Sequence, residues 1–217
     1  MDATGPYGVF ASAPGARVDL LWKDTAPVLS SDKLALTPSL SFSGCPPLDV
    51  LCVPGGAGIL ALLEDLEVHD FLRAQARTAR YLCSVCTGSL ALAAAGLLNG
   101  YMATTHWQSW DLLREFACIP VAQRVVIDRD RVSAAGVSAG IDMALCVAGE
   151  LWGPDMARRI ELSMEYDPHP PFRSGHPSLA PKEIVDALLA QNAARQQTRL
   201  EAVRNAARRL REMGTEP

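Results

Sequence analysis

Residues 80–89 read Arg-Tyr-Leu-Cys-Ser-Val-Cys-Thr-Gly-Ser, and this stretch decides the fold. The run from Tyr81 to Val85 is apolar or small and contains neither proline nor glycine, which predicts a buried strand. Apolar residues then recur at helical spacing as far as Leu98, so a helix follows the strand with almost no turn. The pattern therefore predicts a sharp strand–helix turn at Cys86.

A turn of this kind has a chemical consequence for the cysteine. It lifts the sulfur of Cys86 above the end of a sheet and directs the N–H groups of Thr87 and Gly88 toward it. These groups and the dipole of the following helix stabilise a thiolate, so we expect a lowered pKa at Cys86. Small residues two positions before and after it, Ser84 and Gly88, complete the pattern of a nucleophile elbow.

Two other interpretations of this cysteine are weaker. A free cysteine is often a buried core residue, but the position of Cys86 at the turn favours a nucleophile. Cys83 and Cys86 also form a C-x-x-C pair. A redox pair needs both thiols on the helix side of the turn, whereas we expect Cys83 inside the strand, so we interpret this spacing as accidental.

The composition is that of one globular α/β domain. The chain has 217 residues, of which 49% are hydrophobic and 20% charged, and this is enough for a sizeable core. The formal net charge of −4 gives no reason to expect a nucleic acid as partner. Six cysteines at irregular spacing without a signal peptide predict a reduced, cytoplasmic protein. No apolar run reaches transmembrane length, and no Cys/His pair has metal-ligand spacing, so we expect neither a membrane nor a metal.

The rest of the chain alternates between strands and helices. The continuous apolar run over 48–53 is typical of the middle of a parallel sheet. We expect further strands over 17–22, 101–105, 121–127 and 131–135, and helices over 59–63, 67–79, 106–116, 141–151 and 156–166. This order predicts an α/β fold with a doubly wound, mostly parallel sheet flanked by helices.

Three loops of small residues are expected at one rim of this sheet. Ligands of doubly wound sheets bind beyond the carboxyl ends of the strands, and three of those ends carry Gly55-Gly56, Cys86 and the 136–140 loop. The Gly55-Gly56 loop lacks the P-loop and dinucleotide fingerprints, and it is either an anion or oxyanion nest or a plain tight turn. The convergence of the three loops predicts a single active site around Cys86.

The C-terminal part is expected to be a Pro-rich arm over 167–181 followed by one long helix from 182 to 213. The helix has an apolar seam at 3–4 spacing and is rich in arginine, at positions Arg195, Arg199, Arg204, Arg208, Arg209 and Arg211. A DNA-reading helix would need a second helix to build a helix-turn-helix. We therefore interpret the arginines as a solvated face around a packing seam.

Several motifs together resemble one superfamily. They are Pro54-Gly55-Gly56, the 84–89 elbow, the 95–98 segment Ala-Gly-Leu-Leu, Thr104-Thr105-His106-Trp107 and the 135–142 loop. This set resembles the ThiJ/PfpI superfamily, whose fold is flavodoxin-like and class I glutaminase-like, over nearly the whole chain. Members carry a strand before the Asp-x-Thr-Gly-Pro motif, at which this sequence begins. We therefore expect an α/β domain over 1–181 without its first strand and a helical extension over 182–217.

Within the superfamily, the 2–6 motif, the Trp22-Lys23 strand end and the basic C-terminal helix resemble the isocyanide hydratases. The resemblance implies a hydro-lyase that adds water to a small-molecule isocyanide, forms a homodimer and needs no cofactor. It implies Cys86 as nucleophile, Asp2 as the essential acid, and Thr87 as the threonine after the nucleophile. Related peptidases have a histidine at the position of Thr87, which argues against a protease.

Further residues are expected to shape the pocket. Val137 and Ser138 would form its wall, and the backbone N–H groups of Thr87 and Gly56 would stabilise developing charge. His106 opens a helix near the rim, where a histidine is more often structural than catalytic. The full set of expected pocket and oxyanion residues is Gly55, Gly56, Gly88, Val137, Ser138 and His106.

Three other functions stay open at this point. One is a glyoxalase- or deglycase-like enzyme that uses the same Cys86. Another is a non-enzymatic sensor, since the 104–107 and 138–142 motifs also resemble the sensor half of AraC-type regulators. Those regulators carry a DNA-binding module after the sensor, whereas one helix follows here. The last is a redox sensor in which Cys86 is oxidised to the sulfinic acid.

Overall fold

Strand β6 (Tyr81–Val85) lies in the middle of the main sheet, with the bounds that its sequence predicts. The structure is a computed structural model that describes residues 1–214. Strands β5 (Val50–Val53) and β10 (Arg131–Ala134) pair with β6 in parallel, and β9 (Val125–Asp128) is antiparallel to β10. The order β5-β6-β10-β9 confirms the expected mostly parallel sheet.

The remaining strands are short and form pairs outside this sheet. They are β1 (Leu21–Trp22) with β4 (Leu40–Ser41), β2 (Val28–Leu29) with β3 (Ala35–Leu36), and β7 (Met102–Ala103) with β8 (Ile119–Pro120). The strands expected over 17–22, 101–105 and 121–127 are therefore longer than the observed ones. In each case only part of the β-prone run finds a partner strand, and a strand is defined by its pairing.

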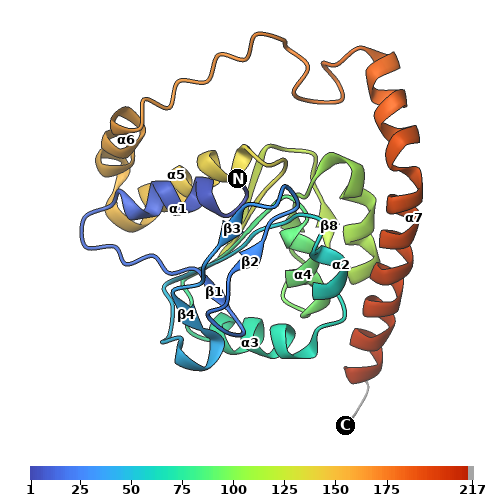
Figure 1. The fold of residues 1–217 in the computed structure, drawn as a ribbon, viewed down its shortest axis with the longest axis horizontal. Helices are drawn as coiled ribbons and strands as arrows, with labels where there is room; N and C mark the ends of the chain where they lie inside the picture. Colours follow the sequence, from blue (N-terminus) through green and yellow to red (C-terminus); the bar gives the residue numbers. More distant parts are fainter. Residues whose placement is uncertain (215–217) are drawn as a thin grey trace.

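Helices cover both faces of the sheet (Figure 1). On one face, the core contains residues of α1 (Thr4–Ala11), α5 (Ala139–Trp152) and α6 (Pro154–Ser163). On the other, it contains residues of α2 (Ile59–Leu62), α3 (Leu66–Ala76), α4 (Gly88–Ala94), the 3-10 helix η2 (Trp107–Phe116) and α7 (Lys182–Met213). A further short 3-10 turn, η1 (Phe42–Gly44), follows β4. Alternate side chains of β6 enter the two cores, Leu82 on the α4 side and Val85 on the α5 side.

Helix α4 is wholly buried and shorter than expected. The apolar sequence predicts a helix to Leu98, but the regular helix ends at Ala94. Gly96 adopts a φ of +79°, a left-handed conformation that ends a helix and that glycine adopts without strain. A run of apolar residues cannot by itself reveal this end.

The C-terminal helix α7 packs on α4 and η2. Its buried contacts include Val203, Ala206 and Ala207, which confirms the predicted packing seam. The segment over 164–181 has no helix or strand, and Figure 1 shows it running across the top of the view from α6 to α7. Residues 215–217 of the expected 182–217 extension lie outside the described residues. No helix within residues 1–214 is both long and apolar enough to cross a membrane.

Candidate active site

Cys86 occupies the sharp turn that the sequence predicts. It lies directly after β6 with a φ of +56°, a conformation that costs free energy for any residue with a side chain. Its own N–H donates to the carbonyl of Ala134 (3.0 Å). Its carbonyl oxygen accepts from the hydroxyls of Thr105 (2.8 Å) and Ser89 (3.2 Å). These bonds from three neighbouring segments hold the strained backbone in place.

Gly88 makes the tight turn possible. A Cβ atom built at this position would lie 2.0 Å from the carbonyl oxygen of Val53, which is far inside van der Waals contact. A residue with a side chain would therefore push the start of α4 away from the end of β5. This close approach is the reason for glycine two positions after Cys86.

Asp2 lies two residues before α1, and its side chain reaches the turn at Cys86. A Cβ on Gly55 would lie 2.6 Å from the nitrogen of Thr87, 2.8 Å from its Oγ1 and 3.0 Å from Oδ2 of Asp2. The bare backbone of Gly55 thus lets these groups gather at one point. The N–H of Gly56 donates to Oγ1 of Thr87 (3.1 Å), which joins the glycine loop to the elbow. Four of the residues expected from the sequence, together with Cys86, therefore meet in space.

Burial has the largest effect on the pKa values of Asp2 and Cys86. Burial raises the pKa of Asp2, while the N-terminal ammonium, the Cys86 thiol and the Gly55 N–H act in the opposite direction. Burial also raises the pKa of Cys86 to about 11, and the charge of Asp2 adds to this rise. The Thr87 N–H lowers it, but by less. The lowered pKa that we expect for Cys86 is therefore wrong, because desolvation and the carboxylate outweigh the backbone N–H groups.

The chemical consequence is a thiol and a carboxyl group that compete for protons. The Cys86 thiol donates a hydrogen bond to the carboxylate of Asp2, which raises one pKa and lowers the other. A thiol with a pKa near 11 stays protonated at neutral pH and needs a nearby base to become a nucleophile. Asp2 is placed to take that proton.

Cys83 lies within β6, as the sequence predicts. It is fully buried and is paired in register with Cys52 of β5. Burial raises the pKa of the Cys83 thiol well above its usual range, with a smaller effect from Cys52. A thiol in this environment is unreactive, which agrees with an accidental C-x-x-C spacing.

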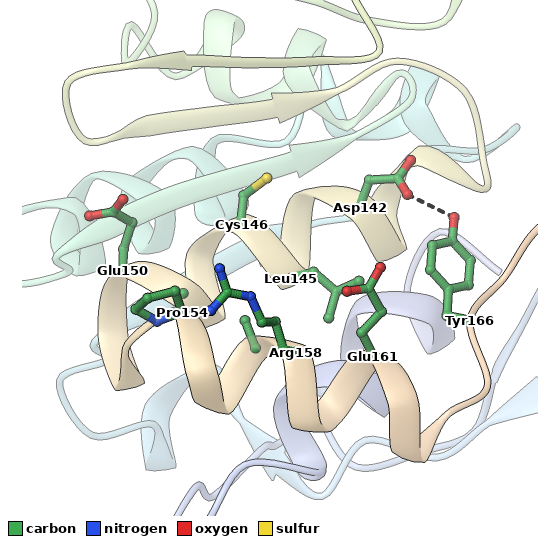
Figure 2. Close-up of a pocket in the computed structure, with 10 residues that line it drawn as sticks. Asp142, Leu145, Cys146, Glu150, Pro154, Arg158, Glu161 and Tyr166 are labelled. Atoms are coloured by element: carbon green, nitrogen blue, oxygen red, sulfur yellow. Dashed lines mark hydrogen bonds between the residues drawn. The ribbon is translucent and has the colours of Figure 1, made fainter.

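The 136–138 loop follows β10, and a hydrogen bond connects it to a residue outside the loop. Val137 is 43% exposed, and Oγ of Ser138 accepts from Arg124 (3.3 Å). Arg124 also pairs with Asp142, whose carboxylate accepts from the hydroxyl of Tyr166 (2.8 Å). Figure 2 shows Asp142 and Tyr166 in this contact. The expected pocket wall is thus anchored to the start of the 164–181 segment.

His106 caps η2. Its Nδ1 accepts from the N–H of Gln108 (3.4 Å), which is a structural role. Burial lowers the pKa of His106, and the positive charges of Arg199 and Arg195 lower it further. The ring is therefore neutral near pH 7, and no hydrogen bond joins it to Cys86 or Asp2 in the part of the chain that is described.

Arg199 is a candidate functional residue that the sequence interpretation missed. Its side chain is only 5% exposed, so for this arginine a solvated face is the wrong interpretation. Nη1 donates to Oγ of Ser109 (3.0 Å) and to Oε1 of Gln196 (3.2 Å). Its spacing in the sequence could have indicated this burial, because Arg199 lies four residues before the seam residue Val203 and therefore on the same face of the helix.

A wide groove lies away from Cys86, between α5 and α6 (Figure 2). Its volume is about 530 Å³, and its lining combines apolar and charged side chains, among them Leu145, Cys146, Glu150, Arg158 and Glu161. None of the expected site residues lines it. Among residues 1–214, no three His, Cys, Asp or Glu side chains gather in a way that could hold a metal ion.

The chain is similar to several known proteins. The isonitrile hydratase of Pseudomonas putida is 51% identical over 210 residues, which cover 97% of this chain and 92% of that protein. The transcriptional regulator GbdR of Pseudomonas aeruginosa is 38% identical over 146 residues, covering 66% of this chain and 40% of the regulator. A crystal structure of a ThiJ/PfpI family protein from Pseudomonas syringae superimposes with a TM-score of 0.90 at 40% identity, covering 95% of this chain and 84% of that one. Residues 1–150 match the DJ-1/PfpI family, and the chain therefore belongs to it.

Proposed function

We propose that this protein hydrates isocyanides to N-substituted formamides, as a cysteine-dependent hydro-lyase. The observation that carries the proposal is the buried pair of Asp2 and Cys86, a proton acceptor placed against a protonated nucleophile. The 51% identity to an isonitrile hydratase supports the same chemistry, since isonitrile and isocyanide name one functional group.

The first half of the reaction forms a thioimidate. Asp2 takes the proton of the Cys86 thiol, and the thiolate attacks the terminal carbon of R–N≡C. The same carbon then gains the proton from Asp2, which gives Cys86–S–CH=N–R. The raised pKa of Asp2 suits this double role, because a buried carboxyl group is a stronger base than an ordinary one.

The second half adds water and releases the product. Asp2, again a carboxylate, takes a proton from the water molecule that attacks the thioimidate carbon. Asp2 then passes this proton to the nitrogen. The tetrahedral intermediate expels the sulfur, which is reprotonated, and leaves R–NH–CHO. Atoms balance, because the sum of the two halves is one isocyanide and one water.

Thr87 and the glycine loop support these steps in our proposal. Oγ1 of Thr87 lies beside Asp2 and accepts from the Gly56 N–H, so it is placed to orient the carboxylate or the water. The N–H groups of Thr87 and Gly56 would stabilise charge that develops on the substrate. Val137 and Ser138, at the far side of the elbow, would limit the size of R.

The direct test is turnover of para-nitrophenyl isocyanide, followed by formation of the formamide. Wild-type protein and Cys146→Ala, which changes an exposed cysteine elsewhere, should both react. Cys86→Ala should lose turnover by at least about 10³-fold, as loss of a nucleophile does. Full activity in Cys86→Ala, or no turnover by the wild-type protein, would overturn the proposal.

A sensor role is the second candidate, and the similarity to GbdR is the observation that favours it. A sensor would bind a small molecule at the same elbow without changing it. Recovery of unaltered ligand after saturation binding would favour this role. A glyoxalase-like activity on Cys86 would instead produce lactate from methylglyoxal.

We also propose that the protein acts in the cytoplasm as a homodimer. All six cysteines are free, which fits a reducing compartment. Large apolar side chains on α6, the 164–181 segment and the start of α7 are exposed, among them Leu162 (81%), Phe172 (80%) and Leu179 (66%). Such a set is typical of an interaction surface. Sedimentation should give a dimer that Leu162→Glu with Phe172→Glu weakens, whereas a monomeric wild-type protein would contradict this.

A further inference from the structure

Arg199 is a buried cation without a carboxylate partner in the described chain. It is 5% exposed, and it lies where α7 packs on η2. The charged side chain that affects it most is Arg195, which has the same sign. An uncompensated charge in a protein interior is costly, so a site that keeps one generally supplies a counter-charge from elsewhere.

The guanidinium is held in place, while one of its edges has no hydrogen-bond partner among residues 1–214. Its two hydrogen bonds within residues 1–214, to Ser109 and Gln196, both come from Nη1. Gln196 is itself fixed, because its Nε2 donates to Oε1 of Gln108 (3.3 Å). Nε is buried and has no partner among residues 1–214, and no hydrogen bond of Nη2 is found there either. The Nε–Nη2 edge is the one that binds two oxygens of a carboxylate side by side.

Arg199 and Cys86 are both hydrogen-bonded to residues of one short segment, 105–109. The partner of Arg199, Ser109, lies four residues after Thr105, whose hydroxyl donates to the carbonyl of Cys86 (2.8 Å). A negative charge on Cys86 would also raise the pKa of Arg199. In the same segment, the neutral His106 accepts at Nδ1 and therefore carries its proton on Nε2, where it offers a second donor.

We propose that Arg199 binds a carboxylate carried by the isocyanide substrate, through its Nε–Nη2 edge, so that the protein prefers isocyano acids over neutral isocyanides. This proposal rests on the proposed hydratase function and adds the class of R group to it. A planar carboxylate presents two oxygens side by side, which matches the two nitrogens of the unpartnered edge. Arg199 is then a specificity-determining residue, not a member of the proton-transfer machinery.

The test compares two substrates that differ in one charge, isocyanoacetate and its methyl ester. Arg199→Met removes the charge at similar volume, and Arg199→Lys keeps the charge without the fork. Arg208→Met is the matched control, because Arg208 is an exposed arginine of the same helix that donates a hydrogen bond to its neighbour Asn205. Wild-type protein should prefer the acid. Arg199→Met should lower kcat/KM for the acid about 10–100-fold, mainly through KM, and that for the ester by less than about threefold.

The outcomes separate this proposal from the hydratase function. Turnover of the ester with no preference for the acid, or an equal loss on both substrates in Arg199→Met, would overturn the role of Arg199 and keep the hydratase. Turnover of para-nitrophenyl isocyanide but of neither isocyanoacetate compound would likewise overturn the role of Arg199 and keep the hydratase. If para-nitrophenyl isocyanide is not turned over either, the hydratase function fails, and calorimetric binding of N-formylglycine against its methyl ester decides the anion site alone. Tighter binding of the acid that Arg199→Met abolishes would support the site, and equal binding would refute it.

Discussion

The thiol of Cys86 donates to the carboxylate of Asp2, so the start of the chain completes a site that is built on a strand–helix turn in its middle. Each group changes the protonation of the other. The negative charge of Asp2 raises the pKa of Cys86, and the thiol stabilises the carboxylate. Burial raises both pKa values, which keeps the proton within the pair instead of in the solvent.

Replacement of Asp2 by asparagine should lower the pKa of Cys86. Burial would still hold it above the ordinary value, but the carboxylate that raises it further would be gone. The rate of iodoacetamide modification of the Cys86 peptide, followed by mass spectrometry against pH, should therefore rise at lower pH in Asp2→Asn. The exposed Cys146 in the same sample is the internal control and should not shift. A profile that moves to higher pH would contradict the coupling.

The same burial should make stability depend on alkaline pH. The folded pKa of Cys86 lies near 11 and above the unfolded value near 9.0, so the unfolded chain releases this proton first as the pH rises. Between these values the folded protein should lose about 1–3 kcal/mol through this group. Urea unfolding of Cys86→Ala from pH 8 to about 10.5 should show a smaller loss than the wild type. Parallel curves would mean that Cys86 is not held as a buried thiol.

The elbow could be predicted from the sequence because its determinants are local. A strand pattern, a helix pattern and Gly88 lie within one short stretch, and backbone sterics leave few ways to join them. The same locality explains why the bounds of β6 were predicted correctly. The short strands were predicted less well, because a β-prone run such as 17–22 becomes a strand only where a partner lies alongside.

The chemistry of the site was harder to predict. The pKa of Cys86 depends on how deeply the turn is buried and on Asp2, and neither burial nor a distant carboxylate is visible in residues 80–89. Arg199 shows the same limit. Its arginine-rich surroundings indicate a solvated helix face, and only the packing of α7 on η2 places this one side chain inside.

Thr87 should matter for rate more than for folding. Thr87→Val keeps the shape but removes the oxygen that accepts from the Gly56 N–H. We expect a stability loss of about 1 kcal/mol and a drop in kcat of about 10–100-fold on a neutral isocyanide. Thr87→Ser retains the hydroxyl and should recover most of the activity. Undiminished turnover by Thr87→Val would show that the hydroxyl orients neither Asp2 nor the water.

Gly88 and Gly58 offer a paired test of the close approach at the elbow. The methyl group of Gly88→Ala would lie 2.0 Å from the Val53 carbonyl oxygen, and backbone atoms cannot yield as a flexible side chain can. We expect destabilisation of about 3 kcal/mol or more, together with loss of turnover. Gly58→Ala meets nothing within 4 Å at an ordinary helical φ of −65°, so it should be neutral or stabilise by about 0.4–1 kcal/mol. Urea unfolding of both variants measures the difference. Equal stability would mean that α4 can shift away from β5 and that the tight turn does not require glycine.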